Sequence, residues 1–317
     1  MARWLRFAPA VLLLTLAACD GDPDDAADAG PGADAGGGGV DAGDECMPPD
    51  DDPFMCESLE ADPACEGTWV VGVTGTVQTA SGAAVVGGRA QLCVRLYPDE
   101  RLVCLLPPMT GDAGDFAIVV PEDIRCLTRA EMRALAPGQS LATTYCPVEF
   151  SGLGPIFDLP EPYVLHPVVA ATVPPVGDET APREVPFADG VILTVAPEDF
   201  ASDDDYLALA GAPVDVAATE CFADGEAFDG AYVFEPEGEL RNGASVSIPN
   251  DAGLAPGAVV DLYILGGLDT LLLDGTMVPE GEVATIGTAT VSADGARIES
   301  DDETLVPYLS WLLWTAR

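Results

Sequence analysis

From Gly67 onward the chain consists of short runs in which apolar and polar residues alternate, with many β-branched side chains and with glycine turns between the runs. Successive side chains of a strand point to opposite faces of its sheet, so this alternation is typical of half-buried strands. Short strands at this spacing favour a β-sandwich. We therefore expect an all-β fold of the β-sandwich class. Its first strands are expected over residues 69–78, 90–97, 102–106 and 116–120.

A hairpin is expected where two of these runs meet at Pro98-Asp99. If the chain turns tightly there, Cys93 lies opposite Cys104 on the neighbouring strand. Side chains directly opposite each other are close enough for a disulfide to join them. Cys93 and Cys104 are therefore a candidate pair, with the strand register open by a residue or two.

The C-terminal region also carries strand signals. Asp294-Gly295 is a type I′ hairpin signal, and a two-residue turn there sets Val291 opposite Ile298 on one buried face. Trp311 and Trp314 lie three apart in the apolar end YLSWLLW. That spacing also suits a helix stripe or a carbohydrate platform, but packing of a final strand or turn in the core is the preferred interpretation.

One short helix is expected, at RAEMRALA. Thr128 and Glu131 have the spacing of a capping box ahead of this segment, and Pro137-Gly138 follows it as a stop signal. Beyond the helix the chain is expected to be extended over residues 140–150 and 163–173.

The chain has nine cysteines. If Cys19 carries a lipid, an even number remains, which fits four disulfides in an oxidising compartment. Zinc binding is the competing interpretation, and it requires CxxC-type spacings that this sequence lacks. The sequence does not determine which cysteines pair. The disulfide candidates are Cys46, Cys56, Cys65, Cys93, Cys104, Cys126, Cys146 and Cys221.

The first nineteen residues, MARWLRFAPAVLLLTLAAC, have the features of a secretory signal: two early arginines, an apolar segment over residues 7–18, and small residues before Cys19. As a helix the apolar segment reaches about 18 Å, too short for a bilayer core of about 30 Å. Leu16-Ala17-Ala18-Cys19 resembles a bacterial lipobox, which implies cleavage before Cys19 and lipidation of that cysteine. The alternative is an ordinary signal peptide with a chance cysteine near its cleavage site.

Residues 20–45 are almost entirely Asp, Gly, Ala and Pro. Such a segment cannot bury enough apolar surface to offset its ordering entropy, so a disordered acidic tether is expected. The run DGDPDD suggests calcium, but Asp25 and Pro31 stand where an EF-hand loop needs glycine and glutamate. Likewise Asp50 to Asp52 is interpreted as a solvated acidic turn rather than a cation patch.

Composition excludes several classes of function. The chain has 54 acidic and 12 basic residues, and every basic residue is an arginine. This negative charge repels nucleic acid and anionic lipid surfaces, so neither is an expected partner of the folded part. Without lysine there is no P-loop lysine, no Schiff-base chemistry and no serine-lysine hydrolysis. His166 is the only histidine, which excludes HExxH zinc sites. It is interpreted as a packed or surface residue, because no GxSxG serine accompanies it.

Two further stretches resemble known modules. GVTGTVQTASGAAVVGGRAQLCV with TGDAGDFAIVVP resembles the carboxypeptidase regulatory-like and Cna-B-type sandwiches, although it carries additional cysteines. REVPFADGVILTVAPEDF and the segments that follow it resemble ZU5-like sandwich domains of envelope proteins, a resemblance that carries no catalytic residues. The expected organisation is a signal peptide over residues 1–18, a lipidated tether with a cysteine-rich end over 19–66, and sandwich modules over 67–182 and 183–317.

Together these features predict an exported, lipid-anchored protein of the bacterial cell envelope that acts as a binding or structural module and not as an enzyme. No catalytic residue, metal site or cofactor is expected, and the expected partners are the membrane, through the lipid, and an envelope protein or polysaccharide. Which membrane holds the lipid stays open. The alternatives are a calcium-dependent adhesion module and a secreted hydrolase with paired carboxylates. Carboxylates available for the hydrolase are Asp203, Asp204, Asp205, Asp301, Asp302 and Glu303.

Overall fold

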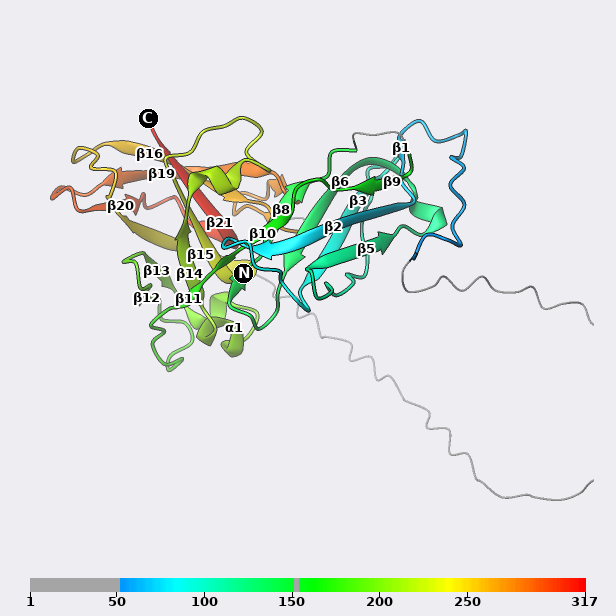
Figure 1. The fold of residues 1–317 in the computed structure, drawn as a ribbon. Helices are drawn as coiled ribbons and strands as arrows, with labels where there is room; N and C mark the ends of the chain where they lie inside the picture. Colours follow the sequence, from blue (N-terminus) through cyan, green and yellow to red (C-terminus); the bar gives the residue numbers. More distant parts are fainter. Residues whose placement is uncertain (1–51, 151–153, 269) are drawn as a thin grey trace, which may run out of the picture. The chain divides into compact units, whose positions relative to one another are not determined.

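The computed structural model describes residues 52–150, 154–268 and 270–317, which are predominantly β-strand (Figure 1). The signal segment, Cys19, Cys46 and the acidic tether lie outside the described residues. All the described residues belong to one compact unit. Among them, no helix has the length and apolar character needed to cross a membrane.

Two five-stranded sheets form the N-terminal part of this unit. The first has the order β1-β6-β3-β4, with β8 paired to β6, and the second has the order β5-β2-β10-β7, with β9 paired to β2. The alternate apolar side chains of both sheets meet in one core, as expected for strands with one buried face. The strands are β1 (Thr68–Trp69), β2 (Gly72–Thr79), β3 (Arg89–Leu96), β4 (Leu102–Cys104), β5 (Asp115–Val119), β6 (Cys126–Leu135), β7 (Leu141–Ala142), β8 (Thr144–Pro147), β9 (Ile156–Asp158) and β10 (Tyr163–Pro167), and the 3₁₀ helix η1 is Glu122–Ile124.

The helix expected at RAEMRALA is wrong, because these residues belong to strand β6. This strand is central in its sheet and pairs with β1, β3 and β8. Its apolar side chains alternate into the core, whereas the charged side chains between them point to the other face of the sheet. Pairing on both edges therefore overrides the local capping signal of Thr128 and Glu131. The core-facing residues are Ala130, Met132 and Ala134.

A nine-stranded sheet forms the C-terminal part. Its longest strand, β15, pairs with β13 and β14 and also with β20 and β21. The path β15-β20-β19-β16-β21 returns to β15, so these five strands close a ring around an apolar core. The strands are β11 (Val169–Ala170), β12 (Arg183–Pro186), β13 (Ile192–Val195), β14 (Ala210–Val214), β15 (Gly230–Pro249), β16 (Val259–Leu265), β19 (Val283–Val291), β20 (Arg297–Ser300) and β21 (Val306–Ala316).

The remaining elements of the C-terminal part are short. Strands β17 and β18 pair only with each other. The single α-helix among the described residues has five residues, and Ser202 caps it by accepting from the backbone N–H of Asp205. These elements are β17 (Thr270–Leu271), β18 (Met277–Val278), α1 (Asp203–Leu207), η2 (Pro197–Asp199) and η3 (Val216–Thr219).

The hairpin expected between Val291 and Ile298 is confirmed in its register, and both side chains are buried. Its turn differs from the expected type I′ geometry, which requires positive φ at both central residues. Gly295 has φ of 73°, whereas Asp294 is not among the described non-glycine residues with positive φ. The Asp294 carboxylate instead accepts from the Ser292 hydroxyl and the Ala296 N–H, which stabilises the loop.

The apolar C-terminal end forms strand β21, as the interpretation of core packing requires. Residues three apart on a strand point to opposite faces, so Trp311 and Trp314 pack in different cores. Trp314 points into the apolar core enclosed by the ring of five strands, and Trp311 faces β7 and β8 of the N-terminal part. Full burial of Trp311 excludes it as an exposed carbohydrate platform.

Three disulfides join cysteines of the described residues, Cys65–Cys126, Cys93–Cys104 and Cys146–Cys221. Cys93 and Cys104 lie directly opposite each other on β3 and β4, which confirms the expected pair. Cys56 is also disulfide-bonded. The Cys146–Cys221 bond links strand β8 to the segment after η3, so it connects the two parts covalently.

The disulfides should differ in their effect on stability. A bond that closes a longer loop restricts the unfolded chain more and therefore stabilises the folded protein more. The expected stabilisation is about 4.5 kcal/mol for Cys146–Cys221, whose cysteines are 75 residues apart, and about 2.8 kcal/mol for Cys93–Cys104, whose cysteines are 11 residues apart. The double variant Cys146→Ser/Cys221→Ser should therefore lose more free energy of unfolding in urea than Cys93→Ser/Cys104→Ser. Equal or reversed losses would contradict this ranking.

Candidate functional site at the junction of the sheets

The outer face of the β3-β6 sheet carries arginines that point away from the core. Arg95 lies on β3, and Arg129 and Arg133 lie four residues apart on the same face of β6. Each of them forms an ion pair with a glutamate of the C-terminal part. The sheet therefore uses a charged face, and not an apolar one, for much of its contact with the rest of the unit.

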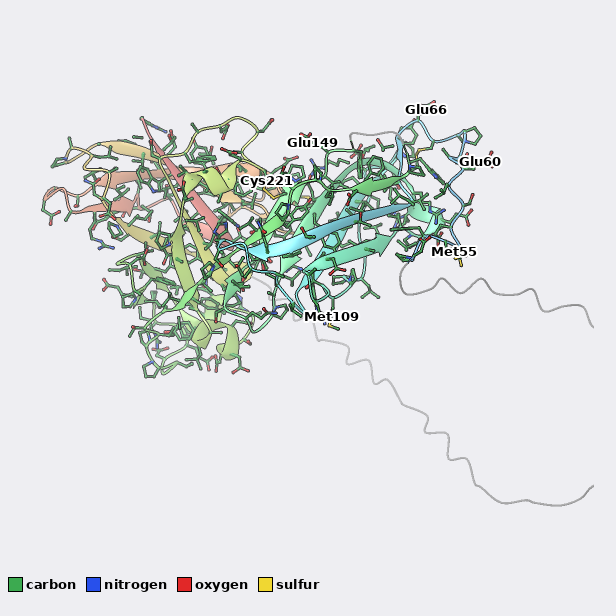
Figure 2. All side chains as sticks on the ribbon, viewed as in Figure 1. Met55, Glu60, Glu66, Met109, Glu149 and Cys221 are labelled. Atoms are coloured by element: carbon green, nitrogen blue, oxygen red, sulfur yellow. A yellow bond between two sulfur atoms is a disulfide. The ribbon has the colours of Figure 1, made fainter. Side chains whose placement is uncertain are left out.

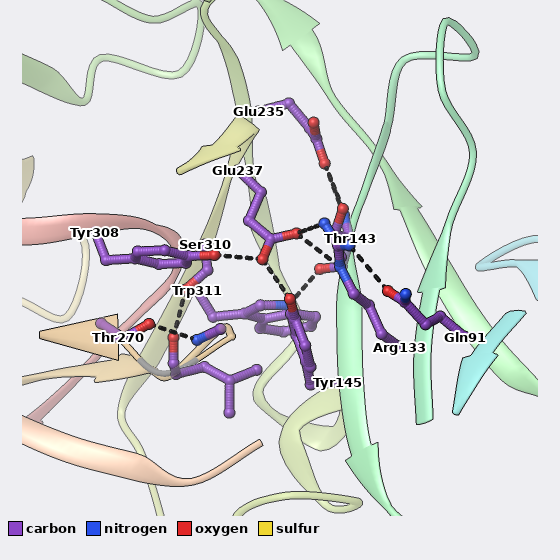
Figure 3. Close-up of polar contacts among 12 residues, drawn as sticks. Gln91, Arg133, Thr143, Tyr145, Glu235, Glu237, Thr270, Tyr308, Ser310 and Trp311 are labelled. Atoms are coloured by element: carbon purple, nitrogen blue, oxygen red, sulfur yellow. Dashed lines mark hydrogen bonds and ion pairs between the residues drawn. The ribbon is translucent and has the colours of Figure 1, made fainter. Parts of the chain in front are cut away.

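Glu237 is the centre of the first group of contacts (Figure 3). Its carboxylate accepts from Arg133 Nη2 at 2.7 Å and Nε at 3.2 Å, from the Tyr308 hydroxyl at 2.5 Å, and from the Tyr145 hydroxyl. The Glu237 side chain is only 5 % exposed. Burying a carboxylate is costly without charged and hydrogen-bonding partners, and here four donor groups supply them.

A bulge in β15 explains how Glu237 reaches this position. The pairing of β15 with β21 shifts register between Val233 and Gly238, and such a shift re-aims the side chains within it. Glu235 lies in the same bulge and accepts from both the backbone N–H and the hydroxyl of Thr143, at 2.8 and 3.0 Å. Both glutamates thereby point toward the N-terminal part (Figure 3).

The two tyrosines of this group are held in their neutral form. Burial, followed by the neighbouring Glu237 carboxylate, raises the pKa of Tyr145 and of Tyr308 above the usual range. Each hydroxyl therefore remains a donor to Glu237. Burial also raises the pKa of Glu235, against the lowering effect of its hydrogen bonds from Thr143.

The second group of contacts joins Arg95 and Arg129 to the turn before β19. Arg95 forms a bidentate pair with Glu280, with Nε–Oε1 at 3.1 Å and Nη2–Oε2 at 2.7 Å. Arg129 donates to Glu282. The Glu280 side chain has no solvent exposure, so losing Arg95 would leave an uncompensated buried anion.

Glu131 lies between these ion pairs on β6 and is the most unusual carboxyl of the junction. It is 5 % exposed, and its Oε2 atom is buried with no hydrogen-bond partner among the described residues. Gly281 packs against it, and a Cβ on that glycine would lie 2.7 Å from Oε2. Burial raises the pKa of Glu131 to about 8; Arg129 opposes this, and Glu280 and Glu282 add to it. The carboxyl is therefore mostly protonated at neutral pH.

The carboxylates that the sequence offers for a hydrolase make local hydrogen bonds and belong to neither group of contacts at the junction. Asp203, Asp204 and Asp205 form the first turn of α1, where Asp205 accepts from the Ser202 hydroxyl. Asp301 accepts from the hydroxyls of Thr288 and Thr290 across neighbouring strands. In the described ranges, no group of three or more His, Cys, Asp or Glu side chains is arranged to hold a metal ion.

His166 is half-buried and packs against Trp311. Its ring stands edge-on to the Trp311 indole with centroids 5.4 Å apart, and burial lowers the pKa of its imidazole. The Trp311 N–H donates to the Thr143 carbonyl. These contacts give His166 a packing role beside the Glu237 group.

Glu131 should make stability depend on pH. Because its pKa is raised from 4.5 to about 8, the folded protein keeps a proton that the unfolded chain releases in this window, so the contribution of Glu131 to the free energy of unfolding falls as pH rises from about 4.5 to 8. Glu131→Gln removes this titrating carboxyl. The free energy of unfolding of the variant should therefore fall less steeply with pH, and above pH 8 it should exceed that of the wild type. Urea denaturation across this range measures the slope.

The control for this measurement is Glu184→Gln, which changes the net charge equally at an exposed strand position. It should keep the wild-type slope. If Glu131→Gln also keeps that slope, the assignment of the raised pKa to Glu131 is wrong.

Comparisons with known proteins do not extend this description. No family model matches the chain, and no curated protein matches it.

Proposed function

We propose that this chain is an exported, lipid-anchored protein of the bacterial cell envelope that serves as a binding or structural surface module. The observation that carries the proposal is the set of disulfides between distant segments, Cys65–Cys126 and Cys146–Cys221. Disulfides of this kind persist in oxidising compartments outside the cytoplasm. The lipobox-like segment before Cys19 supplies the route of export and the anchor.

The junction supports a binding or structural role. A disulfide, two groups of buried ion pairs and a shared apolar cluster around Trp311 hold the two parts of the unit together. Buried, hydrogen-bonded ion pairs favour one arrangement of the parts, because separating them would leave buried charges unpaired. A protein joined in this way presents a fixed surface, which suits binding without conformational change.

Lipidation is tested by metabolic labelling with a fatty-acid analogue. The wild type should be labelled and Cys19→Ser should not, because the thiol of Cys19 is the proposed attachment site. The double variant Cys146→Ser/Cys221→Ser is the matched control for loss of cysteine and should keep the label. Equal labelling of the wild type and Cys19→Ser would refute the anchor.

A carboxylate-dependent hydrolase is the second candidate, and one observation favours it. Glu131 is a buried carboxyl with a raised pKa, which is the property of a general acid. Against this role, its neighbour Glu282 is paired with Arg129. The two carboxyls therefore lack the free, facing arrangement that glycoside hydrolysis requires.

A substrate screen separates the two candidates. We expect no turnover of glycan, ester or peptide substrates above the level of Glu131→Gln, nor above a variant in which the six carboxylates at positions 203–205 and 301–303 are amides. Turnover present in the wild type and absent from Glu131→Gln would establish the hydrolase and identify its acid.

A further inference from the structure

Two neighbouring cavities open beside the Cys146–Cys221 disulfide. One has a volume of about 480 Å³ and the other of about 510 Å³. Pro147, Glu149, Glu220 and Cys221 line both of them, so the two cavities form one continuous depression, which we call the junction groove. Glu149 and Cys221 are labelled in Figure 2.

The two ends of the junction groove differ in chemistry. The end formed by the smaller cavity has a more apolar and proline-rich lining, which includes Leu159, Pro160, Pro162 and Ala218 and one carboxylate of its own, Glu161. The end formed by the larger cavity is acidic. Its carboxyl side chains are Glu131, Glu149, Glu220, Asp224, Glu226 and Glu282.

The acidic groups of the groove have few cations of their own. Arg129 is the one basic residue that lines it among the described residues. Its Nη1 donates to Glu282, and its buried Nη2 has no hydrogen-bond partner there. The carboxylates of Glu149 and Glu220 have no hydrogen-bond or ion-pair partner within the described part of the chain. Since carboxyl side chains outnumber arginines in this lining, the groove favours a cation supplied by another molecule.

Glu131 is an independent indication of a ligand. It is only 5 % exposed, it lines the larger cavity, and its Oε2 has no partner within the described residues. A buried carboxyl without a partner is costly, and a hydrogen bond with a bound molecule would reduce that cost. The groove therefore ends at a carboxyl group whose Oε2 makes no hydrogen bond within the described residues.

The lining indicates what kind of cation fits. A metal ion needs converging ligands, which the described residues do not provide. A small polyamine would leave the apolar end unfilled. A polysaccharide would need exposed ring faces, but the aromatic side chains in the lining, Tyr163 and Phe222, are buried. An extended peptide with basic and apolar residues satisfies both ends.

We propose that the junction groove binds an extended basic segment of a partner envelope protein, in which lysine or arginine side chains face the carboxylates and apolar or proline residues occupy the other end. This inference rests on the proposed role as a binding module. The Cys146–Cys221 disulfide contributes by holding the two walls of the groove in register.

The test uses the full chain in a non-ionic detergent and a fluorescent nine-residue peptide with the sequence Lys-Pro-Leu repeated three times. Fluorescence anisotropy measures its Kd. Glu149→Gln/Glu220→Gln should weaken binding roughly fivefold to tenfold, because two exposed charge pairs are lost. The matched control Glu184→Gln/Glu299→Gln makes the same charge change at exposed strand positions away from the groove and should weaken binding by less than about twofold, through long-range charge alone. A peptide with Glu in place of Lys should not bind.

Three results would overturn the proposal. The first is absence of binding or an equal loss in both double variants, which would mean that net charge alone attracts the probe. The second is spermidine competing as well as the peptide, which would reduce the groove to a simple cation site. The third is a neutral glycan fragment whose binding the groove variant abolishes, which would identify a polysaccharide as the occupant. None of these results bears on lipidation of Cys19, so failure of this proposal is distinguishable from failure of the anchor.

Discussion

The pairing of arginines on one sheet with glutamates of the other part is the interaction on which the rest of the unit depends. Arg133 and Glu237 are 104 residues apart in sequence, and Arg95 and Glu280 are 185 apart. Each pair is buried or nearly so, and each is bidentate or reinforced by tyrosine hydroxyls. Removing one member of a pair would leave an unpaired charge in a low-dielectric environment. These contacts are therefore a strong constraint on how the two parts meet.

Local patterns in the sequence were sufficient for much of the fold. Strand alternation predicted the all-β class and most of the early strands, and a short connection at Pro98-Asp99 predicted the Cys93–Cys104 pair. The same logic predicted the register of Val291 and Ile298, although the turn itself has a different geometry. These predictions succeed because each depends on residues that are close in sequence.

The candidate site was not predictable in this way. In RAEMRALA, local rules favour a helix over a strand and place Glu131 in a capping box, whereas the structure places it on a buried face of the sheet. The alternating charges Arg129, Glu131 and Arg133 were the available signal, since on a strand they share one face. Even that signal does not identify Glu237 or Glu280, because those partners come from distant segments. The raised pKa of Glu131 likewise depends on burial created by Gly281 and its neighbours.

Several of the few arginines of this chain are used in internal contacts, and this affects the charge of its surface. Besides the junction pairs, Arg125 is buried and bonds to the Val120 carbonyl and to Glu57, and Arg297 bonds to Gly190 and Ser247. In a chain with a formal net charge of −42, these scarce cations serve as internal cross-links. A buried arginine–glutamate pair removes one charge of each sign from the surface, so the ratio of acidic to basic groups that remain exposed rises. The same placement that stabilises the fold therefore gives its exposed carboxylates a preference for cations supplied by other molecules.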